Sequence, residues 1–376
     1  MLKRRILLGG LGAAAFAGPG TAGAQAPAVL PTASESAAMS AVAQAMMRKY
    51  GVPGLSIAIG AGGRVVYTET FGYADREHDE KVTSHHIFRV ASTSKAITAV
   101  AIFTLIERAK LKLTDKVFGP GALLGTDFGA PPYHQFIDQI TVDHLLMHTA
   151  GGWSNDAADP MVDLAGEDHR ALITWVLANR KAEHPPGEKY IYSNFGFCVL
   201  GRIVEKLTGE SYQAFVRREI LLRSGAIDMR ISGNTREPRA PGEVVYYDGN
   251  RPGDFPYTVD VARMDSHGGW AGSATSLVRF LIMLPTLLRP DSLNTMLTPS
   301  PPRASYARGW HVNAEGTHWH GGSLPGTAAI MVRTTSGLCW AALCNGGVRG
   351  AGDDSKAIDD MMWSIVRRVP AWHAPT

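Results

Sequence analysis

Three features are missing from the sequence, and each absence argues against a class of protein. There is no cluster of basic residues outside the N-terminus, which argues against nucleic acid and anionic membrane surfaces as partners. There is no Gly-x-Ser-x-Gly motif, which argues against the nucleophile-bearing turn of the α/β-hydrolases. There is no internal repeat, so repeat architectures are not expected either.

Cysteine is scarce, with three residues in 376. Cys198 lies in an apolar helical stretch, while Cys339 and Cys344 are five residues apart on one predicted strand. Residues at odd spacing on a strand point to opposite faces, so these two thiols should not pair. We expect three buried free thiols that pack as small hydrophobic groups.

The overall composition is that of an ordinary globular protein. The chain is 45% hydrophobic and 19% charged, with a formal net charge of +3. Its length suffices for one large core or for two joined subdomains. Disordered and fibrous classes are excluded.

The N-terminus has the pattern of an export signal. Three basic residues (Lys3, Arg4 and Arg5) precede the apolar stretch 6–17 and a small-residue cleavage site, Ala22-Gly23-Ala24. We expect a cleaved signal peptide over residues 1–24, a linker over 25–35 and a periplasmic or secreted product. The Arg4-Arg5 pair also permits a twin-arginine route, and a retained membrane anchor is the alternative. Cleavage would bring the net charge to 3 − 3 = 0.

The two ends of the remaining chain read as one sheet covered by helices. We expect strands around residues 55–59, 65–71, 328–332 and 338–344, and helices over 36–50 and after Asp354. The middle of the chain is helical, with predicted helices over 140–148, 169–179, 194–207, 211–222 and 276–288. The fold class is therefore an α/β sandwich with an inserted all-α subdomain: a sheet subdomain over about 36–112 and 289–376, a helical subdomain over about 113–288, and a cleft between them.

Ser92 and Lys95 form the first candidate catalytic pair. Lys95 is the only charged residue in the apolar run 91–106, and a buried ammonium is costly unless it is paired or deprotonated. At i and i+3 on a helix the two side chains share a face, so a neutral Lys95 amine could accept the Ser92 proton. The alternative is structural, with Ser92 capping a helix and Lys95 reaching solvent from its first turn.

Two further segments carry candidate chemistry. In the first, Tyr192 can relay a proton and the Asn194 amide can orient a substrate or an amine, although Asn194 also fits an N-cap. In the second, residues 318–326, the small residues beside His320 allow close approach of a ligand, and a strand edge there could donate an N–H to an oxyanion. The alternative for this segment is a tight turn.

Two other matches are discounted. His144 and His148 have the i, i+4 spacing of metal ligands, but no carboxylate completes the set, so we expect no metal and no cofactor. Gly18-x-Gly20-x-x-Gly23 imitates a dinucleotide fingerprint, yet it lies in the signal and follows no strand.

Taken together, the motifs resemble those of the serine β-lactamase-related hydrolases. The similarity is to the class C branch, which includes family VIII carboxylesterases, D-aminopeptidases and DD-peptidases, and it covers residues 36–368. It rests on Phe88 to Lys95, Ile140 to Gly152, Pro186-Gly187 through Tyr192-Ser193-Asn194, and His320-Gly321-Gly322. The three motifs that carry Ser92, Tyr192 and His320, 100 and 128 residues apart, are far more specific in this order than any one of them.

The resemblance implies a role for each motif residue. Ser92 would be acylated by an ester or amide, Lys95 would be the general base, Tyr192 a proton relay and Asn194 an orienting group. The backbone N–H groups of Ser92 and Ser323 would form the oxyanion hole. His320, Gly321 and Gly322 would contact substrate.

The chain departs from the family where β-lactamases carry Lys-Thr-Gly. His320-Gly321-Gly322 lacks the fixed cation and hydroxyl that hold a substrate carboxylate, and a histidine is charged only near or below its ordinary pKa of ~6.5. This favours an esterase, an amidase or a D-aminopeptidase. A β-lactamase or D-alanyl-D-alanine carboxypeptidase is the alternative enzyme, and an inactive binding or scaffold protein is the alternative of another class.

Overall fold

The computed structural model describes residues 29–156, 159–164, 166–236, 239–249, 253–348 and 354–372. The expected signal peptide and the first part of the expected linker lie outside these residues. The first helix, α1 (Ala33–Tyr50), begins three residues earlier than the sequence predicted. Thr32 and Glu35 form a capping box there, and the left-handed Gly51 ends the helix.

The centre of the molecule is an eight-stranded antiparallel sheet in the order β3-β2-β1-β11-β10-β9-β8-β7. The predicted N-terminal hairpin pairs with the C-terminal strands through β1 and β11, so both ends of the chain build one sheet as expected. The strands are β1 (Gly54–Ala61), β2 (Arg64–Asp75), β3 (Glu80–Lys81), β7 (Tyr306–Ala307), β8 (Trp310–Val312), β9 (His318–Leu324), β10 (Thr327–Arg333) and β11 (Cys339–Cys344).

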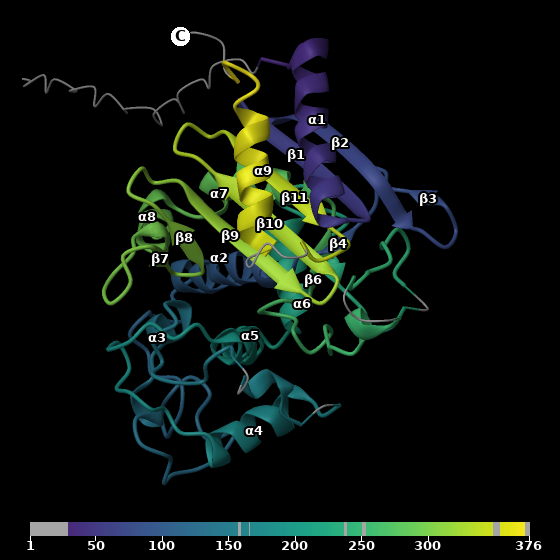
Figure 1. Ribbon diagram of the computed structural model, residues 1–376. Coiled ribbons are helices and arrows are strands. Elements are labelled where there is room, and N and C mark those ends of the chain that lie inside the picture. The colour runs from purple at the N-terminus through teal and green to yellow at the C-terminus, as the bar shows by residue number, and fades with distance from the viewer. Residues whose placement is uncertain are drawn as a thin grey trace, which may run out of the picture.

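Helices cover both faces of this sheet (Figure 1). Helix α1 and helix α9 (Asp354–Val366) pack together on one face, and helix α7 (Ala274–Leu287) packs on β1 and β11 from the other. Alternate strand residues belong to different cores: Ile57 contributes to the α1/α9 core and Ala58 to the larger core on the other side. Cys344 and Cys339 likewise lie in opposite cores, and all three cysteines are free and buried, as predicted.

Four further helices gather at one end of the sheet (Figure 1). They are α3 (Val142–Leu146), α4 (His169–Asn179), α5 (Asn194–Thr208) and α6 (Tyr212–Val216) with its π-helical continuation Arg217–Leu221. Helix α8 (Pro290–Leu297) lies apart from them, beside β7 and β8 (Figure 1). Short 3-10 turns occur at Ile137–Gln139, Pro160–Val162 and Phe255–Tyr257. Helix α7 was expected in this helical part, but it covers the sheet. Its apolar face is visible in the sequence, whereas the partner of that face is not.

Helix α2 (Ser94–Glu107) joins the two parts and is buried almost all round, as its apolar sequence predicted. It contacts α5, α6 and α8. Strand β4 (Phe88–Arg89) comes just before α2 in the chain and belongs to a small sheet with β6 (Trp270–Gly272) and β5 (Arg230–Ile231). Among the described residues, none of the helices combines the length and apolar character needed to cross a membrane.

Candidate active site

Ser92 lies in a tight 3-10 turn, Ala91–Thr93, between β4 and α2. Ala91 has a φ of 47°, which is strained for a residue with a side chain. The turn is held from within, since the Thr93 hydroxyl donates to Val90 O at 2.8 Å and the Ser94 hydroxyl to Ala91 O at 2.7 Å. Ser92 itself is only partly buried and faces a pocket. The turn, held by these two hydrogen bonds, therefore presents the Ser92 hydroxyl to the pocket.

Lys95 lies one turn further along, and its side chain is completely buried. Its Nζ is 3.1 Å from Ser92 Oγ, 2.8 Å from Asn194 Oδ1 and 2.8 Å from the His267 carbonyl. Burial lowers the pKa of Lys95 to about 7, with the negative charge of Asp159 acting in the opposite direction. The alternative in which Lys95 reaches solvent is wrong. At neutral pH a large share of the amine is free to accept a proton.

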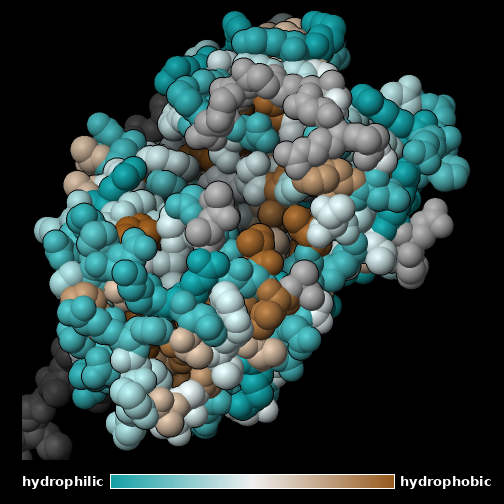
Figure 2. Space-filling model, turned by 60° about the horizontal axis from the view of Figure 1, so that its bottom comes forward, coloured by the Kyte–Doolittle hydropathy of each residue, from teal (hydrophilic) through white to brown (hydrophobic). Residues whose placement is uncertain are grey.

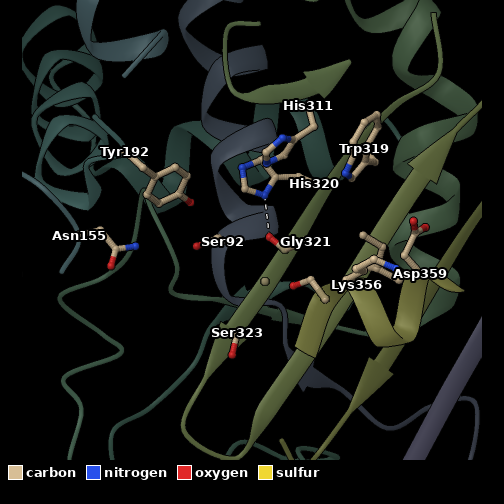
Figure 3. Close-up of a pocket in the computed structure, with 13 residues that line it drawn as sticks. Ser92, Asn155, Tyr192, His311, Trp319, His320, Gly321, Ser323, Lys356 and Asp359 are labelled. Carbon is tan, nitrogen blue, oxygen red and sulfur yellow. Dashed lines mark hydrogen bonds between the residues drawn. The ribbon is translucent and has the colours of Figure 1, made fainter. Parts of the chain in front are cut away.

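Tyr192, two residues before α5, and Asn194, the first residue of α5, complete this cluster. Lys95 Nζ lies 4.8 Å from the centre of the Tyr192 ring. Burial raises the pKa of Tyr192, and hydrogen bonding with the Ser92 side chain opposes that shift, so the hydroxyl is protonated at neutral pH. Figure 3 shows this hydroxyl directed toward Ser92. The N-cap of α5 is Ser193, whose Oγ accepts from Gly196 N, so the alternative role of Asn194 as the cap is wrong.

The third motif forms β9, and the predicted strand at 328–332 follows it as β10. β10 pairs with the whole of β9, but β8 pairs with it only at His318 and Trp319. The second half of β9 is thus free on one side, and the Ser92 turn packs against it. Gly322 makes this approach possible: a Cβ there would lie 2.4 Å from Val90 O and 2.9 Å from Ser92 N. A Cβ on Gly321 would collide with Ser355 of α9 at 2.5 Å.

His320 is buried and both of its ring nitrogens are occupied. Nδ1 donates to Gly321 O at 2.7 Å, so Nε2 is the acceptor for the Tyr306 hydroxyl at 3.3 Å. Burial holds the pKa of His320 well below its usual range. The expectation that His320 carries a charge near pH 6.5 therefore requires correction, because the ring is neutral and has no free N–H for a substrate.

The same network fixes the ring of His148. Ser193 N donates to His148 Nδ1 at 3.0 Å, so His148 Nε2 carries the proton and donates to the Tyr306 hydroxyl at 3.1 Å. His148 lies beyond the end of α3, while His144 is in its first turn and accepts from Thr141 N at 3.2 Å. The two histidines thus have separate structural partners.

The cluster opens into a pocket between the helical end and β9 (Figure 3). Figure 2 shows hydrophobic side chains gathered in the middle of one face and ringed by hydrophilic ones. The lining residues are Ser92, Asn155, Tyr192, His311, Trp319, His320, Gly321, Gly322, Ser323, Ile330, Ser355, Lys356 and Asp359.

Several residues of the site carry no signal in the sequence. The Asp159 carboxylate accepts from Asn194 Nδ2 at 2.8 Å, and the His267 carbonyl accepts from Lys95. Tyr306 joins His148 to His320. Each of these residues belongs to an irregular loop or a two-residue strand, where no periodic pattern marks its position.

Known proteins are similar to most of this chain. The family model described as Beta-lactamase matches residues 39–360. The chain is 27% identical over 303 residues to penicillin-binding protein 4* of Bacillus subtilis (strain 168), covering 72% of this chain and 63% of that protein. It is 28% identical over 171 residues to protein flp of Staphylococcus aureus (strain NCTC 8325 / PS 47), covering 45% and 33%. The chain thus spans less than two thirds of either curated relative.

Solved structures share the fold. D-amino acid amidase from Ochrobactrum anthropi SV3, complexed with L-phenylalanine amide, superposes with a TM-score of 0.73 at 21% identity, covering 90% of this chain and 99% of that one. The octameric penicillin-binding protein homologue from Pyrococcus abyssi superposes with a TM-score of 0.71 at 24% identity, covering 88% and 77%. The expected sandwich of an antiparallel sheet and helices is confirmed.

Proposed function

We propose that this chain, which belongs to the beta-lactamase family of serine hydrolases, cleaves ester or amide bonds of small molecules through a covalent acyl-enzyme on Ser92. The observation that carries the proposal is the 3.1 Å contact between Ser92 Oγ and a buried Lys95 whose pKa is lowered to about 7. A nucleophile and a matched base at this distance are the minimum that acyl transfer requires.

Formation and hydrolysis of the acyl-enzyme use the same groups. Lys95 takes the Ser92 proton as Oγ attacks the substrate carbonyl, and the tetrahedral intermediate expels the leaving alcohol or amine. Tyr192, protonated at neutral pH, gives its proton to that leaving group and is reprotonated from Lys95. Water then attacks the acyl carbonyl by the reverse route, which releases the acid and restores Ser92. No step consumes a metal or a cofactor.

In this proposal, two backbone N–H groups donate hydrogen bonds to the carbonyl oxygen as it becomes negatively charged. The first is Ser92 N at the turn before α2, and the second is Ser323 N on the half of β9 that has one strand partner. One donor of this kind contributes about 3 kcal/mol of transition-state stabilisation. The close approach of the turn to Gly322 brings the two segments together.

Substrate preference follows from the neutral ring of His320 in the pocket wall. His320 offers neither a positive charge nor a free N–H, so it cannot hold a substrate carboxylate as the lysine of Lys-Thr-Gly would. We therefore favour uncharged esters and amides, including D-amino acid amides, over β-lactams and peptides that end in a carboxylate. The similarity to a penicillin-binding protein supports the β-lactamase or D-alanyl-D-alanine carboxypeptidase alternative.

A substrate panel tests the proposal. Purified protein lacking residues 1–24 is assayed with short p-nitrophenyl esters, D- and L-amino acid amides, a chromogenic cephalosporin and a D-alanyl-D-alanine peptide. We expect turnover of an ester or amide, with weaker turnover of the last two, and loss of all turnover in Ser92→Ala. Preference for the cephalosporin or the peptide supports the alternative, and a folded protein that turns over nothing supports the scaffold function.

We also propose that the chain is exported, because residues 1–24 have the composition of a signal peptide. N-terminal sequencing of protein from a periplasmic fraction should begin at Gln25. An intact N-terminus in the membrane fraction would indicate an anchor that is retained.

A further inference from the structure

Asp159 stands behind the proposed base, out of contact with the pocket opening. Its side chain is 7% exposed, and it caps the 3-10 turn Pro160–Val162 by accepting from Met161 N at 3.0 Å. Its second oxygen accepts from Asn194 Nδ2 at 2.8 Å. No arginine, lysine or histidine in the described part of the chain forms an ion pair with it within 4.0 Å. A buried carboxylate without a direct cation partner is costly and calls for a reason.

The contact with Asn194 fixes which way the amide points. An ionised carboxylate only accepts hydrogen bonds, so Asn194 must turn its NH₂ group toward Asp159. The amide oxygen then faces Lys95 Nζ at 2.8 Å. If the amide were reversed, its NH₂ would point at the amine and its oxygen would oppose the carboxylate.

The loop that carries Asp159 is anchored from a second side. Arg263 is buried and donates to the carbonyls of Met161, Asp163, Leu164 and Glu167 at 2.7 to 3.3 Å. Arg263 precedes His267, whose carbonyl is the other oxygen that holds Lys95. The two acceptors of the amine are thus tied to one loop, one through Asp159 and Asn194 and the other through the Arg263 segment.

Lys95 is surrounded by one carboxylate and by titratable groups that are neutral. Asp159 is the carboxylate whose charge acts on it, from the Pro160–Val162 turn. The other titratable groups that face it are Tyr192 before α5, His148 after α3, His267 before β6 and His320 on β9. Burial keeps the three histidines neutral by lowering their pKa values well below the usual range.

From this geometry we propose that Asp159 is a positioning residue for the reaction: through Asn194 it orients the Lys95 amine toward Ser92, and it supplies the negative charge that acts on that amine. The inference rests on the proposed function of Ser92 and Lys95. It explains why an aspartate is buried in a loop that lies outside all three sequence motifs.

The test compares pH profiles of kcat/KM, and of the second-order rate of Ser92 phosphonylation by a fluorophosphonate, in three variants. Asp159→Asn removes the charge and the constraint on the Asn194 amide. The acid limb of the profile is the range in which the rate falls because Lys95 is protonated. We expect this limb to move to lower pH, because loss of a nearby negative charge favours the neutral amine. We also expect the plateau to fall roughly ten- to hundredfold, because the amine is less well placed.

Two further variants separate charge and position from simple damage to the loop. Asp159→Glu keeps the charge but shifts the oxygen, so its acid limb should stay near the wild-type position while its plateau falls. Asp163→Asn is the matched control: it makes the same change four residues along, where the carboxylate pairs with Arg180 at 2.9 Å, and its profile should match the wild type.

Contradiction would be equally clear. The proposal fails if the pH profile of Asp159→Asn has the acid limb and the plateau of the wild type. It also fails if the acid limb of Asp159→Asn stays in place and Asp163→Asn gives the same profile as Asp159→Asn. It also fails if neither Asp159 variant folds, since the residue would then serve the stability of the loop. If wild-type protein is not labelled at Ser92 at all, the proposed function fails first, and the two failures are thereby distinguished.

Discussion

At the scale of single residues, the central feature is the Lys95 amine. It is buried away from water, yet it still has hydrogen-bond acceptors. Lys95 Nζ has two oxygens at 2.8 Å and the Ser92 hydroxyl at 3.1 Å. The two closer oxygens hold the amine in place, and the hydroxyl is the one partner that can give up a proton to it. Desolvation and geometry therefore act together to make Lys95 a base.

This arrangement predicts the pH dependence of the reaction. The pKa of Lys95 is lowered to about 7, so the base is protonated and inactive below that pH and free above it. For an uncharged substrate, kcat/KM should rise about tenfold per pH unit below the pKa and level off above it. A limb near the ordinary lysine value, or a profile flat from pH 5 to 9, would contradict the assignment.

The sequence was sufficient to predict the pair of Ser92 and Lys95, since a lone charge in an apolar helix is visible without coordinates. The side-chain chemistry of Tyr192 and Asn194 also made them candidates, and the family resemblance gave each a role. The sequence could not predict that His320 is neutral, because the partners that occupy its ring nitrogens, Tyr306 and Gly321 O, become evident only in three dimensions. Asp159 was missed for the same reason.

At the scale of elements, the site depends on how closely the Ser92 turn packs against β9. A Cβ on Gly322 would make three contacts below 3.0 Å, two with the backbone atoms Val90 O and Ser92 N and one with the short side chain of Ala91. Backbone cannot give way as a flexible side chain can. The glycine is therefore needed for contact between two segments that are over 200 residues apart.

Gly322→Ala should displace the turn and impair the site. We expect kcat/KM to fall roughly a hundredfold, because small displacements of reacting groups are costly, and the free energy of unfolding to fall by about 1 to 3 kcal/mol. Steady-state kinetics and thermal unfolding measure the two effects.

Gly233→Ala is the matched control, since a Cβ there has no neighbour within 4 Å and the residue has no left-handed backbone. It should keep wild-type kinetics and nearly wild-type stability. Equal behaviour of the two variants would show that the close packing on Gly322 is unimportant.

The sequence predicted most of the helices and the strands β1, β2, β10 and β11 to within a few residues, because strand alternation and helical periodicity are local signals. Helix α4 matched its predicted bounds, and the hairpin of β1 and β2 was recognised from its turn. The partner of α7 depends on packing between distant segments, and α7 was therefore assigned to the wrong part of the molecule.

At the scale of the whole molecule, a buried arginine ties the start of α2 to distant loops. Arg89 on β4 is fully buried and donates to Ser232 Oγ, Gly233 O and Pro256 O at 2.7 to 3.1 Å. Its guanidinium also lies 4.3 Å from the centre of the Tyr246 ring. These partners are more than 140 residues away in sequence, so local pattern could not reveal them.

Arg89→Met should therefore destabilise the protein. It leaves buried carbonyls without donors, and we expect a loss of about 3 kcal/mol or more in unfolding free energy. Thermal unfolding is the measurement. Arg289→Met is the control: its side chain is 68% exposed beside Glu107, so the change should stay within about 0.5 kcal/mol. A comparable loss in Tm for both variants would contradict the role of Arg89.

The covalent labelling of Ser92 tests the whole account most directly. The purified chain without residues 1–24 is incubated with a fluorophosphonate at pH 8, and its intact mass and its peptide map are recorded. We expect one adduct per chain, located on Ser92, no adduct in Ser92→Ala, and slow labelling in Lys95→Ala. An unlabelled wild-type protein, or an adduct that persists in Ser92→Ala, would contradict the account.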